Sequence, residues 1–94
     1  MKQARNFAIA MQEKPFQVRI LVNFEGIKVL ENFSPYEALY KEVLSYGAEV
    51  YFCENAIKAF GISPDILPEK SQTIPSGIVA LAQWQEEGFR YVRA

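Results

Sequence analysis

Histidine is absent from this chain of 94 residues, and cysteine occurs once, as Cys53. The missing histidine excludes catalysis by a histidine general base within the chain. A single cysteine forms no internal disulfide, and without histidine it makes a zinc site of ordinary ligands implausible. We therefore expect neither a metal nor a cofactor.

The chain also lacks an excess of either charge and any long hydrophobic run. Ten Lys and Arg residues stand against eleven Asp and Glu residues, a formal net charge of −1 at pH 7. A basic surface for nucleic acid is therefore not expected. No segment approaches the ~18 apolar residues of a membrane span, and the first residues do not have the pattern of a signal peptide. We predict a cytoplasmic protein without membrane or nucleic-acid partners.

Apolar residues are what the chain has in plenty, at 50% of the sequence, with 14% aromatic residues. This content is too apolar for a disordered chain, and the length fits a single domain over residues 1–94. A domain this short buries a limited share of its surface. We therefore expect self-association to cover part of the remaining apolar surface.

Strand-like and helix-like patterns alternate along the sequence. Strands are predicted over residues 16–24, 48–53, 71–74 and 89–93, and helices over 2–12, 25–32, 54–60, 75–88 and from Ser34 to a stop at Gly47, with a short helical turn over 63–67. Ser34 and Glu37 have the spacing of a capping box, and Gly47 and Gly61 suit helix ends. Ala4, Phe7, Ala8 and Met11 are expected to face the core from the first helix. Because strands alternate with helices, we predict an α/β fold: a three-layer α/β/α sandwich with a mainly parallel sheet.

The carboxyl edge of such a sheet is where ligands bind. Three strand-to-helix junctions fall on that edge, and they contain Asn23, Glu25 and Gly26; Cys53, Glu54 and Asn55; and Ser76 and Gly77. Helix starts offer unpaired N–H groups and the positive end of a dipole. The sequence therefore predicts an anion-favouring crevice that contains one thiol.

Cys53 has two interpretations at that edge. The reactive thiolate is favoured at a helix N-terminus, whereas the neighbouring Glu54 opposes it unless Lys58 pairs with that carboxylate. Free cysteine is also among the most buried residue types, so an inert, small core residue is the other interpretation. Spacing and composition alone leave both open.

The helix over 75–88 carries a further prediction. Ile78, Leu81 and Ala82 form an apolar stripe, Gln85 lies within it, and Trp84 lies on its flank. A buried amide needs a partner, so Gln85 is expected in the core or at a subunit contact. Trp84 is the second interface candidate.

The strings "CENAIKAFGI", "ILP" and "PSGIVALAQWQEEGFRYVR" resemble the DsrE/DsrF-like family of small α/β proteins. The resemblance covers roughly residues 4 to 94, and the matching positions are Gly47, Cys53, Asn55, Gly61, Ile62, Leu67, Pro68, Ser76, Gly77, Gln85, Gly88 and Tyr91. It implies a homo-oligomer, a trimer or hexamer. It also implies that the cysteine matching Cys53 carries sulfur as a persulfide between a sulfur donor protein and an acceptor protein.

Two features depart from the family pattern. Family members begin with a strand before the first helix, and this domain is expected to lack it. Relay members also have small residues and arginines in the helix after the cysteine, where this chain has Glu54, Lys58 and Phe60.

The sequence leaves three candidate functions. The first is a sulfur-relay, sulfurtransferase-like protein with persulfide sulfur on Cys53. The alternative is a non-catalytic oligomeric module that binds a ligand in the same crevice. An enzyme that uses Glu25 or Glu54 as a base ranks last, because neither shows a paired carboxylate.

Overall fold

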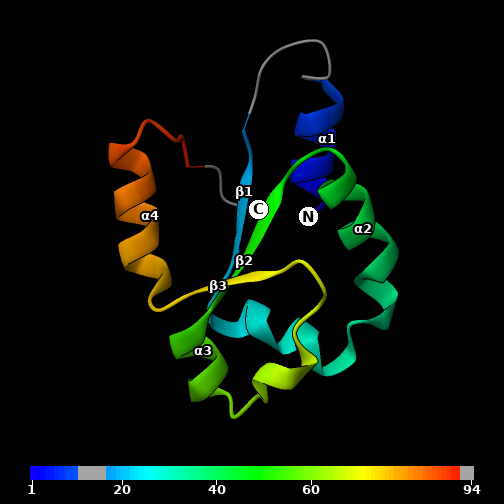
Figure 1. Ribbon diagram of the computed structural model, residues 1–94, viewed down its shortest axis with the longest axis vertical. Coiled ribbons are helices and arrows are strands. Elements are labelled where there is room, and N and C mark those ends of the chain that lie inside the picture. The colour runs from blue at the N-terminus through cyan, green and yellow to red at the C-terminus, as the bar shows by residue number, and fades with distance from the viewer. Residues whose placement is uncertain (11–16, 92–94) are drawn as a thin grey trace.

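The computed structural model describes residues 1–10 and 17–91, in which three parallel strands form one sheet (Figure 1). The strands are β1 (Arg19–Val22), β2 (Glu49–Cys53) and β3 (Gln72–Ile74), in the order β1-β2-β3. In the register, Ile20 lies opposite Val50, and Phe52 lies opposite Thr73. The predicted α/β class and parallel sheet are confirmed.

Helices cover both faces of this sheet. The α-helices are α1 (Lys2–Ala10), α2 (Glu37–Ser45), α3 (Glu54–Ala59) and α4 (Gly77–Glu86), and the 3-10 helices are η1 (Phe24–Asn32), η2 (Ser34–Tyr36) and η3 (Pro64–Ile66). Figure 1 shows α1 and α2 together on one side of the strands and α4 on the other. An ion pair between Arg5 and Glu42, 3.9 Å apart, links α1 to α2. The arrangement has the three predicted layers.

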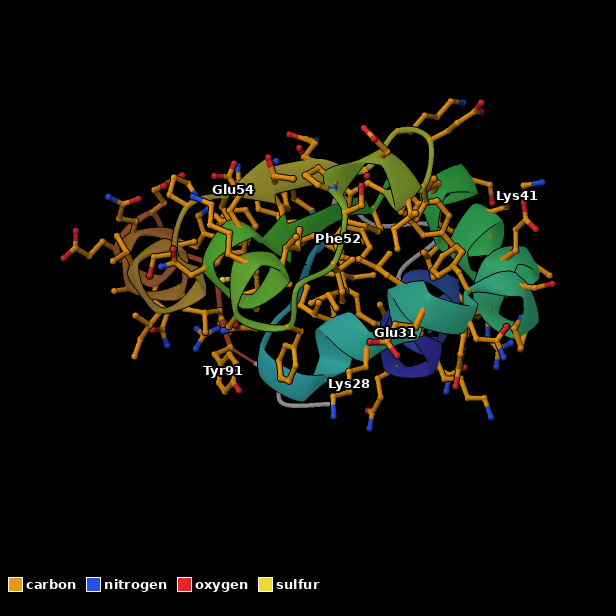
Figure 2. All side chains as sticks on the ribbon, turned by 90° about the horizontal axis from the view of Figure 1, so that it is seen from below. Lys28, Glu31, Lys41, Phe52, Glu54 and Tyr91 are labelled. Atoms are coloured by element: carbon orange, nitrogen blue, oxygen red, sulfur yellow. The ribbon has the colours of Figure 1, made fainter. Side chains whose placement is uncertain are left out.

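The main core lies on the α2 side of the sheet. Alternate residues of a strand point to opposite faces, so Val50 and Phe52 of β2 share this side and are fully buried. They pack in one cluster with buried residues of η1, α2 and α3: Ile27, Leu30, Tyr40, Val43, Ala56 and Ile57. Figure 2 shows Phe52 in the interior, with Lys28, Glu31 and Lys41 projecting outward. Burial of these large apolar groups drives the fold.

The helix ends follow the sequence in part. Gly47 and Gly61 have φ of 88° and 65°, the left-handed conformation in which glycine ends a helix, as predicted. The capping box at Ser34 is wrong, because Ser34 lies inside η2 and its side chain caps no described backbone group. The Glu37 N–H instead donates to the Ser34 backbone carbonyl, so the 3-10 turn itself satisfies the helix start.

Two other expectations are corrected by the structure. Phe7 was expected in the core, yet it is 47% exposed, because α1 faces α2 through Arg5. The strand predicted over 89–93 does not form over 89–91, where Phe89 folds back onto α4 and its N–H donates to the Trp84 carbonyl at 2.9 Å. The ends of two predicted elements, residues 11, 12, 16, 92 and 93, and the expected core residue Met11 lie outside the described residues.

Among residues 1–10 and 17–91, no helix combines the length and the hydropathy that crossing a bilayer requires.

Candidate functional site

Cys53 is the last residue of β2, and it points to the α4 side of the sheet. Its position in the strand alternates with that of Phe52. At the strand end Cys53 nevertheless belongs to the same buried cluster as Phe52 and Ile57. The residue is buried, at 3% exposure. Its Sγ accepts a hydrogen bond from the backbone N–H of Gly77, the first residue of α4, at 3.3 Å. The thiol therefore meets the start of α4 inside the protein.

The start of α4 is built to leave that N–H available. Ser76 is the N-cap residue, with an extended backbone at φ −140°, and its carbonyl accepts from the Ala80 N–H at 3.1 Å. The first N–H groups of a helix have no partner within the helix, and the Ser76 hydroxyl caps none of the described ones. The sulfur of Cys53 takes the place of the missing cap. The Gly77 N–H lies at the amino end of a ten-residue helix, which is the positive end of the helix dipole.

Gly77 is required by the close approach of α4 to the end of β1. A Cβ on this residue would lie 2.5 Å from Asn23 Nδ2 and 3.2 Å from Leu21 Cδ2. Both distances are shorter than ordinary contacts, so a larger residue forces a neighbour to move. The structure thus brings Asn23, Cys53 and Gly77 together from three predicted junctions, and their role in binding an anion stays a prediction.

Glu54 and Asn55, which were also predicted at this site, lie beside Cys53 and differ in their hydrogen bonds. The Glu54 carboxylate accepts from the Thr73 hydroxyl at 3.0 Å, and among described side chains Lys58 does not pair with it. The Asn55 N–H donates to the Pro75 carbonyl at 3.3 Å, while the residue is exposed. These bonds join α3 to the β3–α4 connection beside the thiol.

The two predicted site residues that follow Asn23, Glu25 and Gly26, contribute no described side-chain contact to the site. Glu25 lies within η1, and its side chain is outside what the structure describes. Gly26 is exposed, and its N–H donates to the Asn23 carbonyl at 3.0 Å, which turns the chain from β1 into η1.

Helix α4 is rotated relative to the sequence-based expectation. Ile78, taken as part of the inward stripe, is 70% exposed, and Gln85 is exposed beside it. The inward face instead holds Gly77, Ala80 and Trp84, which recur at helical spacing. The small residues let α4 approach the sheet, and Trp84 packs on Tyr51 of β2 with ring centroids 5.0 Å apart.

The outward face of α4 forms a hollow of about 260 Å³, and the residues that line it are Ile78, Leu81, Ala82, Gln85 and Tyr91. Gln85 is therefore not a core amide. Its place in a subunit interface, like that of Trp84, is not tested by a single chain and stays a prediction.

Arg19, which the sequence analysis did not single out, organises the opposite end of the sheet. Its guanidinium lies over the rings of Trp84 and Phe89, 5.3 and 4.4 Å from their centroids. It also pairs with Glu49 at 3.5 Å and with Glu87 at 3.6 Å. An arginine and a glutamate that open neighbouring strands were the available signal, but the pairing of β1 with β2 was needed to see it.

Glu49 is the charged partner at the centre of this cluster. Burial raises the pKa of its carboxyl, but hydrogen bonds from Tyr51 at 3.0 Å and Gln72 at 3.3 Å, with the charge of Arg19, outweigh burial and leave the pKa below its ordinary value. The pKa of Tyr51 is raised, first by burial and then by its bond to Glu49. Glu49 therefore stays ionised and holds β1, β2 and β3 together.

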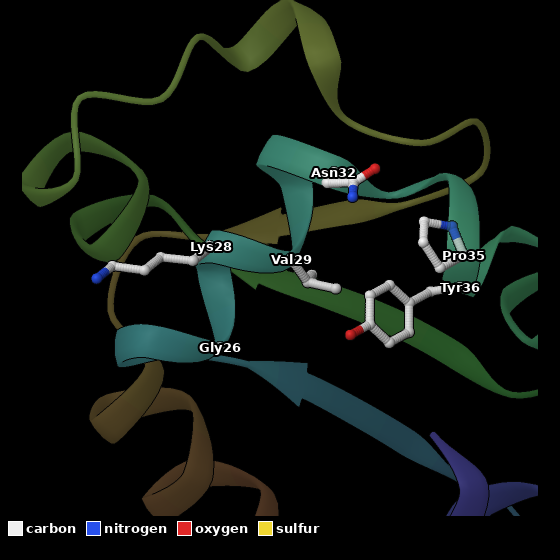
Figure 3. Close-up of a pocket in the computed structure, with 6 residues that line it drawn as sticks. All are labelled: Gly26, Lys28, Val29, Asn32, Pro35 and Tyr36. Carbon is white, nitrogen blue, oxygen red and sulfur yellow. The ribbon is translucent and has the colours of Figure 1, made fainter.

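A second hollow of about 430 Å³ lies away from Cys53, and it is lined by Gly26, Lys28, Val29, Asn32, Pro35 and Tyr36 (Figure 3). Figure 3 shows Lys28 directed away from Tyr36. The Lys28 ammonium lies over the Phe60 ring, 5.2 Å from its centroid. The polar side chains of this hollow are exposed and do not converge on one point, so we assign it no chemistry.

Comparison with known proteins agrees with the fold and with the predicted family. The family model described as DsrE/DsrF-like matches residues 2–94, so the chain belongs to the DsrE/DsrF-like family. The predicted resemblance is confirmed.

Among solved structures, the protein of unknown function MTH1491 from Methanobacterium thermoautotrophicum is similar, with a TM-score of 0.78 and 28% identity. The match covers 99% of this chain and 85% of that one. No curated protein matches the chain at a significant level.

Proposed function

We propose that this protein takes part in sulfur relay and holds the transferred sulfur as a persulfide on Cys53. Membership of the DsrE/DsrF-like family supports sulfur relay in general. The observation that carries the finer proposal is the 3.3 Å hydrogen bond from the Gly77 N–H to Cys53 Sγ at the start of α4. A persulfide is more acidic than a thiol, so an N–H and a helix dipole suit it.

The transfer needs no oxidant or reductant beyond the two protein partners. The Cys53 thiolate attacks the outer sulfur of a persulfide on the donor protein, the S–S bond of the donor breaks, and the donor thiolate leaves. Cys53 then carries the extra sulfur. A thiolate of the acceptor attacks that outer sulfur in turn, and the Cys53 thiolate is restored.

The residues that meet at Cys53 have separate parts in this proposal. The Gly77 N–H holds the charged sulfur, while Asn23 comes from the junction after β1 and Ser76 from the junction after β3. Glu54 is held by Thr73, which limits its approach to the sulfur. Binding roles for Glu25, Gly26 and Asn55 stay predictions.

Self-association is the second part of the proposal. The outward face of α4 leaves Ile78 at 70% exposure, and Tyr91 beyond the helix is 55% exposed beside it, although inward residues of the same helix are buried. A helix that is apolar on both faces is typical of burial on both sides, which supports a homo-oligomer with Gln85 near the contact. Trp84 packs inward on Tyr51, and its place at an interface stays a prediction. A trimer or hexamer and a cytoplasmic location stay predictions.

Mass spectrometry of the protein after reaction with a sulfur donor tests the proposed function. The wild-type protein is incubated with a polysulfide or a persulfide-bearing cysteine desulfurase, alkylated, digested and analysed. We expect one added sulfur atom on the peptide that contains Cys53, and none on Cys53→Ser. An unmodified Cys53 at donor excess would contradict the proposal.

The burial of Cys53 is the observation that favours the alternative, a non-catalytic binding module. That alternative predicts that Cys53→Ala keeps the binding of a partner protein intact in a pull-down from the organism of origin. The sulfur-relay proposal predicts that Cys53→Ala retains the fold but transfers no sulfur to any acceptor.

A further inference from the structure

Burial of Cys53 raises the question of how a partner reaches its sulfur. The residue is 3% exposed, and the first residue of α4, Gly77, is buried against it. A persulfide donor is a protein, so its sulfur cannot attach until some part of this chain moves aside. Four elements surround the strand end that carries Cys53, namely β3, whose Ile74 lies opposite Cys53 in the sheet, α3, α4 and the end of β1.

The attachment of α4 to the domain is uneven along its length. At its amino end the buried residues are Gly77 and Ala80, whose small side chains bury little apolar area. The main core cluster takes its helical members from η1, α2 and α3, with Ala56 and Ile57 from α3. Moving α3 therefore breaks the core, whereas lifting the first turn of α4 does not.

The carboxyl end of α4 is anchored much more firmly. Trp84 packs on Tyr51, and Arg19 contacts the rings of Trp84 and Phe89 while pairing with Glu87 just beyond the helix. Figure 1 shows α4 on the opposite side of the sheet from α1 and α2, attached to β3 by a short connection. The carboxyl end of the helix is thus held by rings and ion pairs, whereas the amino end is held by the bond from Gly77 to Cys53 and the bond from Asn55 to Pro75, with small residues in the contact.

We infer that the amino end of α4 is a lid over Cys53, which lifts about the Arg19–Trp84 anchor to admit the sulfur donor. Closing the lid restores the Gly77 N–H to the sulfur, so the same movement that exposes the thiol also removes its hydrogen-bond donor. The lid rests on the proposed function for its purpose, but its movement is measurable with any small thiol reagent.

Thiol labelling in urea tests the lid in the wild-type protein. The Cys53 thiolate attacks an aromatic disulfide, whose S–S bond breaks, and the released coloured thiolate reports the rate. Labelling through a local opening responds weakly to urea, whereas labelling through global unfolding responds fully. We expect the weak response at low urea. A full response, or labelling as fast as in the unfolded chain, would overturn the lid.

Gly77→Ala is the variant that props the lid open. Its Cβ would meet Asn23 Nδ2 at 2.5 Å, and it keeps the N–H that bonds Cys53. We expect labelling to accelerate about tenfold relative to wild type. Asn23→Ala added to Gly77→Ala removes the clash and should return the rate toward wild type. Gln83→Ala, on the exposed side of α4, should stay within about twofold. If Cys53 is labelled at the same rate in Gly77→Ala as in Gln83→Ala, the amino end of α4 is not a lid.

Sulfur donors separate the lid from the proposed function. If labelling is gated but a polysulfide adds no sulfur to Cys53, the lid stands and the sulfur-relay proposal fails. If a persulfide donor protein modifies wild type and Gly77→Ala at equal rates, the sulfur-relay proposal stands and the lid fails. Faster modification of Gly77→Ala supports both.

Discussion

The two faces of the sheet are covered by different kinds of side chains. On the α2 side, large apolar side chains such as Phe52, Val43 and Ile27 are fully buried in one cluster. On the α4 side, Gly77 and Ala80 make the close contact, and an arginine, a glutamate and aromatic rings fill the rest. Cys53, the only cysteine of the sequence, lies where the two sides meet: it belongs to the buried cluster, and its Sγ accepts from the Gly77 N–H on the α4 side.

The difference indicates that the two faces of the sheet contribute differently to the stability of the protein. Apolar burial supplies most of the free energy of folding, so the α2 side determines whether the chain is folded. The α4 side buries less and depends on a few directed contacts, so parts of it open at lower cost. The proposed lid would expose Cys53 by opening part of the α4 side while the α2 side stays folded.

Phe52→Ala should have the largest effect on stability. Deleting a fully buried ring leaves a cavity in the main core, and we expect the free energy of unfolding to fall by about 3–5 kcal/mol. Urea denaturation followed by circular dichroism measures it. If the variant does not fold, Ile27→Val at the same core should cost about 1 kcal/mol. Neutral effects at both positions would break the comparison of the two faces.

Trp84→Ala should cost less than Phe52→Ala, although tryptophan is the larger side chain. Trp84 is half-buried and contacts Tyr51 and Arg19 only on one side, so we expect a loss of about 2 kcal/mol. The same urea titration applies, with Gln83→Ala as the control, expected within about 0.5 kcal/mol. A cost above that of Phe52→Ala would mean that the α4 side carries the core.

Arg19→Lys should lower the free energy of unfolding by about 1 kcal/mol. Lysine keeps the charge near Glu49 and Glu87 but loses the planar contact with the Trp84 and Phe89 rings. Tryptophan fluorescence should also change, since Trp84 is the one tryptophan of the chain. Unchanged stability and fluorescence together would show that Arg19 does not anchor α4.

Glu49→Gln should have the smallest effect, visible mainly in the pH dependence of stability. The lowered pKa of Glu49 gives a contribution that is present above the ordinary pKa of 4.5 and is lost as pH falls through the folded-state pKa. Between about pH 7 and pH 3, wild type should therefore lose more stability than Glu49→Gln in urea titrations. Equal losses of stability would show that ionised Glu49 does not stabilise the fold.

The sequence was sufficient for the fold class because strands that alternate with helices form a local pattern, and that pattern implies parallel strand pairing. The alternation of strands with helices, and the glycine stops at Gly47 and Gly61, appear in the structure as predicted. The rotation of α4 was not predictable in this way. Its apolar residues occupy both faces, and the choice between Ile78 and Ala80 as the buried residue is made by Tyr51 and Asn23, which come from other elements.

The sequence predicted where the candidate site lies, but not the burial or the hydrogen bonding of its residues. The junctions at residues 23, 53 and 77 meet because the carboxyl ends of parallel strands share one edge. Burial of Cys53 and the bond from Gly77 depend on how closely α4 approaches the sheet, which no local pattern encodes. The Arg19 cluster likewise depends on the register of β1 with β2.

Amide hydrogen exchange, resolved residue by residue, tests most directly whether the α4 side opens while the α2 side stays closed. The amides of Ala80 and Leu81 should exchange through openings that respond weakly to urea, well before those of Val50 and Phe52, which should wait for global unfolding. Identical protection and identical urea dependence at the two sets of amides would contradict the account, because the domain would then open as a single unit.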